Sequence, residues 1–259
     1  MGCVESCCGA VNRRRRGSNQ IVPLTSIRNI VTKKYLILLA CDKYKHMDNL
    51  YACVNDAKLI KQTLISQYIV LCELYDDELT LMNFLSMLQQ IKSTITSYSK
   101  LVFFFAGHGI LDDDSGRSFL CFHDTHKNNL LVNAFDMHFL RLYCDHIASK
   151  KQLYIIDSCH SAFVMRARGS KYSVKRSLPA IKCLCSSQSH QSAIEMGKNS
   201  LFTRHLVSSI QVGLTSTDIF CRVRQKMLES NIDQVPVLGN LVMCHRGESC
   251  TDGDIIVLD

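Results

Sequence analysis

Short, continuous apolar runs alternate with segments of helical periodicity from residue 34 onward. Runs of this kind are typical of strands buried on both faces, and they occupy residues 34–41, 68–76, 100–109, 151–161, 180–188 and 239–245. A shorter apolar stretch at 119–124 fits an extension of the sheet. Apolar residues recur at the spacing of one helical face in 55–67, 80–99, 133–147, 201–211 and 216–230. This alternation predicts a mainly parallel sheet with helices on both faces.

One α/β domain accounts for this pattern better than two. We expect it to span residues 34–250, after an N-terminal tether at 1–33 and before a short C-terminal tail at 251–259. A chain of 259 residues is long enough for such a domain to bury a full core. A doubly wound nucleotide-binding protein would carry a glycine-rich phosphate loop after its first strand, but the sequence there is ACDKYKHMDN. That class of protein is therefore disfavoured.

The composition is that of an ordinary globular protein, with 47% hydrophobic and 20% charged residues. No apolar run approaches the roughly 20 residues that cross a bilayer, and the first residues lack the apolar core of a secretory signal. Fourteen cysteines would suggest a disulfide framework in a small secreted protein. Because nothing routes this chain to an oxidising compartment, we expect most of them to be reduced, buried thiols.

Positive charge is concentrated near the N-terminus. The chain has a formal net charge of +7, and residues 1–34 hold seven arginines and lysines against one acidic residue. The remaining 225 residues are close to neutral, with a balance of +1. A near-neutral body with a basic arm argues for a localised partner of the arm and against a nucleic-acid-binding domain.

The N-terminal arm has the features of a membrane address. The opening MGCVES fits the N-myristoylation pattern, with Gly2 as the acceptor and Ser6 at the required position. Cys3 is available for a second acyl chain, and a basic patch follows, made of Arg13, Arg14, Arg15 and Arg16. Such a patch binds anionic lipid with about 1 kcal/mol per basic residue, whereas one myristoyl chain alone binds only marginally. We expect a cytoplasmic protein held on the cytosolic face of a membrane; the alternative is a disordered tail that matches the motif by chance.

Two of the expected strands end in reactive side chains. His108 follows LVFFFAG and Cys159 follows LYIIDS, and parallel strands present their carboxyl ends at one edge of the sheet. If the two strands are neighbours, the imidazole faces the thiol across the crevice. An adjacent imidazole favours the thiolate, which is the nucleophilic form, and can protonate a leaving amine. The amides of Gly109 and Cys159 are then candidates for an oxyanion hole.

These segments resemble the active-site boxes of the caspase-like cysteine peptidases. FAGHG looks like the histidine box and DSCHS like the nucleophile box, and the sequence separation of 51 between His108 and Cys159 is similar to the caspase spacing of about 50. YACVNDAK is similar to the metacaspase stretch after the first strand, and QSAIE, SLFTRHL and QVPVLGNL resemble the small-subunit half. The similarity covers residues 34–245 and is closest to the metacaspase and paracaspase branches.

The resemblance implies a caspase-hemoglobinase-like fold, which is a three-layer α/β/α sandwich around a mainly parallel six-stranded sheet. It divides the domain into a large-subunit-like part at 34–163, a basic loop at 164–178 and a small-subunit-like part at 179–250. It also implies a cysteine endopeptidase in which His108 and Cys159 form the catalytic dyad. A monomer and a homodimer both stay open, because metacaspases are typically monomeric whereas caspases pair through their last strand.

The residue before the scissile bond, P1, is expected to be basic. Caspases carry glutamine two residues before the nucleophile and bind a P1 aspartate with arginines, whereas Asp157 stands at that position here. The resemblance to metacaspases maps a second acidic residue of the S1 pocket onto Asp56. Two carboxylates attract a guanidinium or ammonium group and repel an acidic one, so we expect peptide substrates with Arg or Lys at P1. The alternative roles are structural: Asp56 as a helix N-cap and Asp157 as a hydrogen-bond anchor after the strand. A lesser alternative is an Asp-specific caspase.

The loop at 164–178 carries several basic residues and no acidic one, which suits an acidic S1 pocket. It occupies the position at which members of the family are cut between their two halves. We therefore expect self-cleavage there, after Arg166, Arg168 or Arg176. The plain alternative is a solvated loop with no such role.

Metal binding receives weaker support. Many metacaspases bind calcium through aspartates between the two boxes, and Asp112, Asp113 and Asp114 are able to attract a hard cation. The paired acids expected before the next helix are reduced to Asp136, so the match to the family fails at this point. We expect no cofactor, with calcium as a lesser alternative. Zinc is disfavoured because Cys183 and Cys185 lack a CxxC partner.

A catalytically silent, membrane-tethered scaffold or regulator is the main rival hypothesis. Such caspase-like proteins usually lose the cysteine or the histidine, but both are present here beside a glycine and an aspartate. Activity is therefore favoured. Irreversible labelling of Cys159 by an inhibitor with a basic P1 group would distinguish the two, since a scaffold need not recognise that group.

Overall fold

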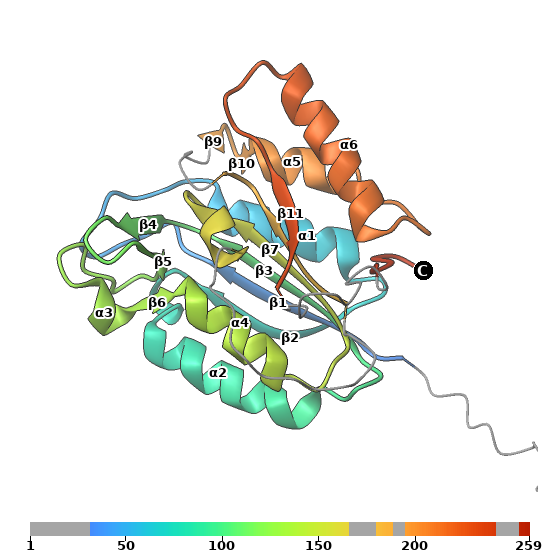
Figure 1. The fold of residues 1–259 in the computed structure, drawn as a ribbon, viewed down its shortest axis with the longest axis horizontal. Coiled ribbons are helices and arrows are strands. Elements are labelled where there is room, and N and C mark those ends of the chain that lie inside the picture. Colours follow the sequence, from blue (N-terminus) through green and yellow to red (C-terminus); the bar gives the residue numbers. More distant parts are fainter. Residues whose placement is uncertain (1–31, 166–179, 189–194, 242–253) are drawn as a thin grey trace, which may run out of the picture. The chain divides into compact units, whose positions relative to one another are not determined.

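Six strands form the central sheet, in the order β11-β8-β7-β3-β1-β2 (Figure 1). The computed structural model describes residues 32–165, 180–188, 195–241 and 254–259. The strands are β1 Lys34–Ala40, β2 Ile69–Tyr75, β3 Lys100–Ala106, β7 Lys151–Asp157, β8 Ala180–Cys185 and β11 Val237–Asn240. Neighbouring strands are parallel except β11 and β8, which are antiparallel. The expected mainly parallel six-stranded sheet is confirmed.

Helices cover both faces of this sheet (Figure 1). One face carries α1 (Cys53–Leu64), α5 (Leu201–Val207) and α6 (Ser216–Glu229), and the other carries α2 (Leu81–Thr94) and α4 (Met137–His146). An apolar core lies between the sheet and each helical layer, which confirms the three-layer α/β/α sandwich. None of the helices in the described ranges is long and apolar enough to cross a membrane.

Successive residues of one strand belong to different cores. In β1, Leu36 and Leu38 pack in the core that includes α1 and α5, whereas Ile37 and Leu39 pack in the core that includes α2 and α4. All four side chains are fully buried. Because both faces of the strand exclude water, nearly every position is apolar, and the sequence shows continuous runs in place of alternation.

Several short elements complete the fold, and all but β5 were missed in the sequence. A second, antiparallel sheet consists of β4 (Gly109–Asp112), β5 (Arg117–Cys121) and β6 (Ala134–Asp136), and a hairpin consists of β9 (Glu195–Met196) and β10 (Asn199–Ser200). The stretch expected at 119–124 overlaps β5, which belongs to this second sheet and does not extend the central one. The others are η1 Asp76–Glu78, α3 Leu130–Asn133 and η2 Ser161–Met165. Elements of two to five residues are too short for hydrophobic periodicity to reveal.

Element boundaries depart from the prediction where a side chain sets them. The helix expected at 133–147 begins only at Met137, because the Asp136 carboxylate accepts the N–H of His138 at 2.8 Å as its N-cap. The strand expected at 239–245 is found as β11, which begins two residues earlier and ends at Asn240. Residues 242–245 of the expected strand lie outside the described residues.

The last six residues pack onto the domain. Ile255 and Val257 are each 1% exposed and belong to the core on the α1 side of the sheet. Asp259 forms ion pairs with Lys100 and Lys34, at 2.6 and 2.9 Å, where β3 and β1 begin. This part of the expected tail is therefore continuous with the packed domain, beyond the limit expected at residue 250.

The Asp259 carboxylate is expected to stabilise the fold, because Lys100 is only 7% exposed and depends on it for an ion pair. Since Asp259 itself is half exposed, Asp259→Ala should lower the free energy of unfolding by about 1–3 kcal/mol, between the values typical of exposed and of buried pairs. Urea denaturation measures the difference in the free energy of unfolding. The matched control is Asp77→Ala, which removes an exposed aspartate. Equal stability of Asp259→Ala and wild type would contradict this role.

Candidate active site

The ends of β3 and β7 bring the two reactive side chains to the same level of the sheet. The strands are parallel neighbours, and Ala106 of β3 lies opposite Asp157 of β7. His108 and Cys159 each follow two residues later. The N–H of Gly107 donates to the Asp157 carbonyl at 3.2 Å, which extends the ladder beyond the last paired residues. The adjacency that the expected crevice requires is therefore present.

Gly109 packs against the backbone that carries Cys159. A Cβ atom built on Gly109 would lie 2.1 Å from the carbonyl oxygen of Cys159 and 3.0 Å from Oγ of Ser158. Real Cβ atoms essentially never approach another atom within 3.0 Å, so any side chain here would displace the Cys159 backbone. This contact joins the histidine segment to the cysteine segment directly, and it requires glycine.

The loop between β1 and α1 orients the imidazole of His108. Its Nε2 atom lies 2.9 Å from the carbonyl oxygen of Asp48, and the His108 backbone N–H donates to the Tyr44 hydroxyl at 2.8 Å. The rings of Tyr44 and His108 have centroids 4.7 Å apart. Because a carbonyl only accepts, the Asp48 contact favours the tautomer protonated on Nε2, which leaves Nδ1 as the acceptor. Neither Tyr44 nor Asp48 was identified from the sequence.

Cys159 is only partly buried, at the turn between β7 and η2. The next residue, His160, has a left-handed backbone with φ 56°, which few non-glycine residues adopt. Most other thiols in the described part of the chain are buried, and burial raises the pKa of the Cys41 thiol to about 12. A thiol of that kind stays protonated and unreactive. None of the nine cysteines in the described residues forms a disulfide.

Hydroxyl and thiol groups at the end of β8 hold the turn that carries Cys159. Oγ of Ser187 donates to the carbonyl of Ser158 at 3.0 Å, and Sγ of Cys185 donates to the carbonyl of Ser161 at 3.3 Å. These residues come from the sequence CSSQ and were missed as site residues. Their position at the carboxyl end of a strand parallel to β7 is the feature that could have identified them.

Asp56 and Asp157 lie close together and are almost completely buried, at 1% and 5% exposure. Ser200 connects them: its N–H is shared between the two oxygens of Asp56, both at 3.1 Å, and its hydroxyl donates to Oδ2 of Asp157 at 2.5 Å. Asn199 Nδ2 also donates to Asp56, at 2.7 Å, and the Thr203 hydroxyl donates to Asp157, at 3.0 Å. The two acids assigned to one pocket from the sequence are therefore brought together.

Of the alternative structural roles of these two acids, the structure contradicts the one for Asp56 and confirms the one for Asp157. Asp56 was a candidate N-cap, but α1 begins at Cys53, and the Asp42 carboxylate accepts the N–H groups of Cys53 and Val54 at 2.8 and 3.2 Å. The Asp56 carboxylate instead accepts donors that lie more than 140 residues away in the sequence. Asp157 does act as a hydrogen-bond anchor, since its side chain ties the end of β7 to α5.

Burial raises the pKa of Asp56 to about 7, and the charge of Asp157 adds to this effect. Hydrogen bonds from Asn199 and Ser200 act in the opposite direction, because they stabilise the ionised carboxylate. The pair therefore retains a proton close to neutral pH. A guanidinium or ammonium group beside it would favour the fully ionised form.

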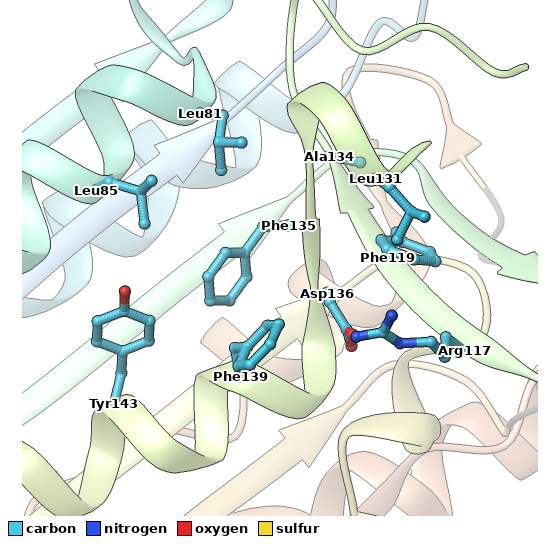
Figure 2. A pocket seen from close by; sticks show the side chains of 10 residues that line it. All are labelled: Leu81, Leu85, Arg117, Phe119, Leu131, Ala134, Phe135, Asp136, Phe139 and Tyr143. Atoms are coloured by element: carbon cyan, nitrogen blue, oxygen red, sulfur yellow. The ribbon is translucent and has the colours of Figure 1, made fainter. Parts of the chain in front are cut away.

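Asp136, considered above as a calcium ligand, is paired with Arg117. This ion pair lies beside an apolar cavity of about 280 Å³ between α2, α4, β5 and β6, shown in Figure 2. The remaining walls of the cavity are formed by Leu81, Leu85, Phe119, Leu131, Ala134, Phe135, Phe139 and Tyr143. Within the ranges that the structure describes, no group of three or more His, Cys, Asp or Glu side chains is arranged to hold a metal ion.

Some of the sites expected from the sequence lie outside the described residues. They are the lipidation sites and basic patch of the N-terminal arm, and the three self-cleavage positions. By number, they are Gly2, Cys3, Arg13, Arg14, Arg15, Arg16, Arg166, Arg168 and Arg176.

The sequence matches the caspase domain of the C14 peptidases over residues 33–242, which is most of the chain. The fold and this match define the class of protein: the chain belongs to the caspase-domain family, a family of cysteine peptidases whose substrates are proteins.

Two solved structures are similar in fold. The protein GSU0716 from Geobacter sulfurreducens has a TM-score of 0.63 and 15% sequence identity, over 80% of this chain and 93% of that one. Caspase-1 from Spodoptera frugiperda has a TM-score of 0.60 and 16% identity, over 81% of this chain and 87% of that one. Among curated proteins, none matches the sequence. At these identities the structural likeness establishes the fold alone.

The contact between Gly109 and Cys159 predicts that an added methyl group will inactivate the site. In Gly109→Ala the Cβ atom would displace the Cys159 carbonyl, and a shift of about 1 Å at a reacting group lowers rates by roughly 100-fold. Peptidase activity and thermal unfolding should be measured together, with Gly116→Asn as the control. Nothing lies within 4 Å of a Cβ atom at Gly116, and Asn tolerates its φ of +64°. Full activity of Gly109→Ala would show that the contact is unimportant.

The raised pKa of Asp56 makes stability depend on pH in a defined direction. The unfolded chain loses the Asp56 proton near the ordinary value of 3.8, whereas the folded protein keeps it to about pH 7. The folded protein holds the Asp56 proton more tightly than the unfolded chain does, and this contribution to stability is present at low pH. It is lost as the pH rises through this window, so the free energy of unfolding falls. The slope of the free energy of unfolding against pH, measured by urea denaturation, should be flatter for Asp56→Asn than for wild type. The exposed carboxylate variant Asp77→Asn should keep the wild-type slope, and an unchanged slope in Asp56→Asn would count against the buried acid pair.

Proposed function

We propose that the protein is a cysteine endopeptidase that hydrolyses peptide bonds after arginine or lysine, with Cys159 as the nucleophile and His108 as the base. The observation that carries the proposal is the buried pair of carboxylates, Asp56 and Asp157, of which Asp157 stands two residues before the partly exposed thiol of Cys159. Burying two like charges is costly for folding. Binding of a cationic substrate group accounts for their presence.

The reaction begins when the Cys159 thiol transfers its proton to Nδ1 of His108. The thiolate attacks the carbonyl carbon of the scissile bond, and the carbonyl oxygen becomes negatively charged. The N–H groups of Gly109 and Cys159 donate to this oxygen as the oxyanion hole. His108 then protonates the leaving amine, and the C–N bond breaks. Water then attacks the thioester carbon while His108 accepts its proton, and the C–S bond breaks to release the carboxylic product. His108 returns the proton to the Cys159 sulfur, which restores the thiol.

Specificity follows from the charge of the acid pair. A basic P1 side chain compensates both Asp56 and Asp157, so the proton held near pH 7 is released when the substrate binds. A P1 aspartate would bring a further negative charge to an acid pair that already holds a proton because its two charges repel each other. The Asp-specific alternative is therefore disfavoured.

Self-processing follows from the same specificity. Arg166, Arg168 and Arg176 each offer a basic P1 residue in the loop that joins the two halves of the domain. Acylation at Gly2 and Cys3, together with the basic patch that follows, would hold the peptidase on the cytosolic face of a membrane.

We also propose that activity does not require calcium. The Asp136 carboxylate, at the position where a calcium ligand was sought, already has a positive partner in Arg117. Its other oxygen accepts the N–H of His138 at the start of α4. Chelation by EDTA should then leave the activity unchanged.

A peptide library with every amino acid at P1 tests the proposal, with wild type compared to Cys159→Ala and His108→Ala. We expect cleavage after Arg and Lys, with kcat/KM at least about 100-fold higher than after Asp, since like-charge contacts cost several kcal/mol. Both variants should be inactive, and neither calcium nor EDTA should alter the rates. Intact-mass analysis should show cleavage within 164–178 in wild type and not in Cys159→Ala.

Three outcomes would contradict different parts of the proposal. Cleavage after Asp but not after Arg or Lys would refute the basic specificity. Fragmentation of Cys159→Ala at the same loop as wild type would refute self-processing. A folded protein that cleaves no member of the library would favour the silent scaffold over the peptidase.

A further inference from the structure

We infer that Ser200 is a positioning residue for substrate selectivity, because it donates a hydrogen bond to each of the two acidic side chains and so fixes their relative positions. The inference rests on the proposed function, in which Asp56 and Asp157 bind the basic P1 side chain. It concerns which basic side chain is preferred, a property that the fold and the dyad leave open.

The surroundings of Ser200 determine all of its hydrogen bonds. Its N–H is shared between the two oxygens of Asp56, and its Oγ accepts the N–H of Thr203 at 2.9 Å. With Oγ acting as this acceptor, the single hydroxyl proton is directed at Oδ2 of Asp157. Ser200 is 5% exposed, so water competes little for these bonds.

The neighbouring donors each support one carboxylate. Asn199 donates to Asp56, and the Thr203 hydroxyl donates to Asp157. Two buried carboxylates repel each other, so bonds to one of them do not fix the distance between the two. Ser200 contacts both through its own N and Oγ atoms, whose separation is limited by covalent geometry. The spacing of the acid pair therefore depends on this serine.

The local fold prevents Ser200 from shifting. It is the last residue of β10 and the N-cap of α5, so a movement of its backbone would disturb the hairpin and the first turn of the helix together. Asp157 is in turn fixed at the end of β7, opposite Ala106 of β3. Both sides of the hydrogen bond between Ser200 and Asp157 are thus held by regular structure.

A fixed spacing between two carboxylates favours arginine over lysine at P1. The guanidinium group is planar and donates several hydrogen bonds in fixed directions, so it gains most when its acceptors are held in matching positions. The lysine ammonium group is a compact charge on a flexible stem and tolerates a change in spacing. Loosening the pair should weaken arginine substrates more than lysine substrates.

The test compares the hydrolysis of two fluorogenic peptides that differ only in arginine or lysine at P1. In Ser200→Ala we expect kcat/KM to fall roughly tenfold for arginine and roughly threefold for lysine, mainly through KM, as for the loss of one hydrogen bond to a charged group. The arginine-to-lysine ratio then falls about threefold. Ser200→Thr keeps a hydroxyl and a good N-cap, and it should restore most of the ratio.

Thr215→Ala is the matched control. Thr215 caps α6 through the same kind of bond, from the N–H of Asp218 to its hydroxyl, and is not part of the acid pair. This variant should lose thermal stability and keep the wild-type ratio. Ser200→Gly is a second test variant, because glycine is well tolerated at N-caps and also lacks the hydroxyl. It allows the arginine-to-lysine ratio to be measured without the hydroxyl even if Ser200→Ala folds poorly.

The outcomes separate this inference from the proposed function. If wild type cleaves neither peptide, the proposed function fails and the inference fails with it. If wild type cleaves both, and Ser200→Ala and Ser200→Gly keep the wild-type ratio, the inference alone is overturned. An equal change of the ratio in Thr215→Ala would also overturn it, because the effect would then come from a lost helix cap.

Discussion

The parallel pairing of β3 with β7 is the contact on which the candidate site depends. Its register sets Ala106 opposite Asp157. The two segments that follow these strands leave the sheet at the same level and lead to His108 and Cys159. The absence of a side chain at Gly109 lets the two departing segments touch. Because these strands are buried on both faces, a slip of one residue would exchange every side chain between the two cores. The large energy of packing two cores therefore holds the relative positions of the two reactive residues.

The acid pair contrasts with this favourable packing. Asp56 and Asp157 are buried close to each other, and the pKa of Asp56 rises as a result. Hydrogen bonds from Ser200 and its neighbours make the arrangement tolerable without neutralising it. Such unfavourable electrostatics in a folded protein are typical of functional sites, where a ligand relieves them. In the proposed function, the same burial that weakens the empty protein gives the site its discrimination by charge.

How far the sequence predicts the structure depends on whether the cause is local. The strands were predicted because burial on both faces leaves a continuous apolar run, and the long helices because burial of one face leaves apolar residues at helical spacing. Cys159 and Asp157 were identified because they directly follow such a run. Ser200 and Asp48 were not, because their roles arise from partners far away in the chain: Ser200 is 144 residues from Asp56, and Asp48 is 60 residues from His108. Only folding brings these groups together.

Covalent labelling tests the central claim, that Cys159 and the acid pair form one site, most directly. A peptidyl-arginyl ketone with a leaving group alkylates a thiolate only when the P1 side chain is bound beside it, so attachment reports both features at once. We expect one adduct per chain, on Cys159, with the arginyl reagent, and none with the matched aspartyl reagent. Asp56→Asn should slow the arginyl reaction. Equal labelling by the two reagents, or labelling elsewhere than Cys159, would contradict it.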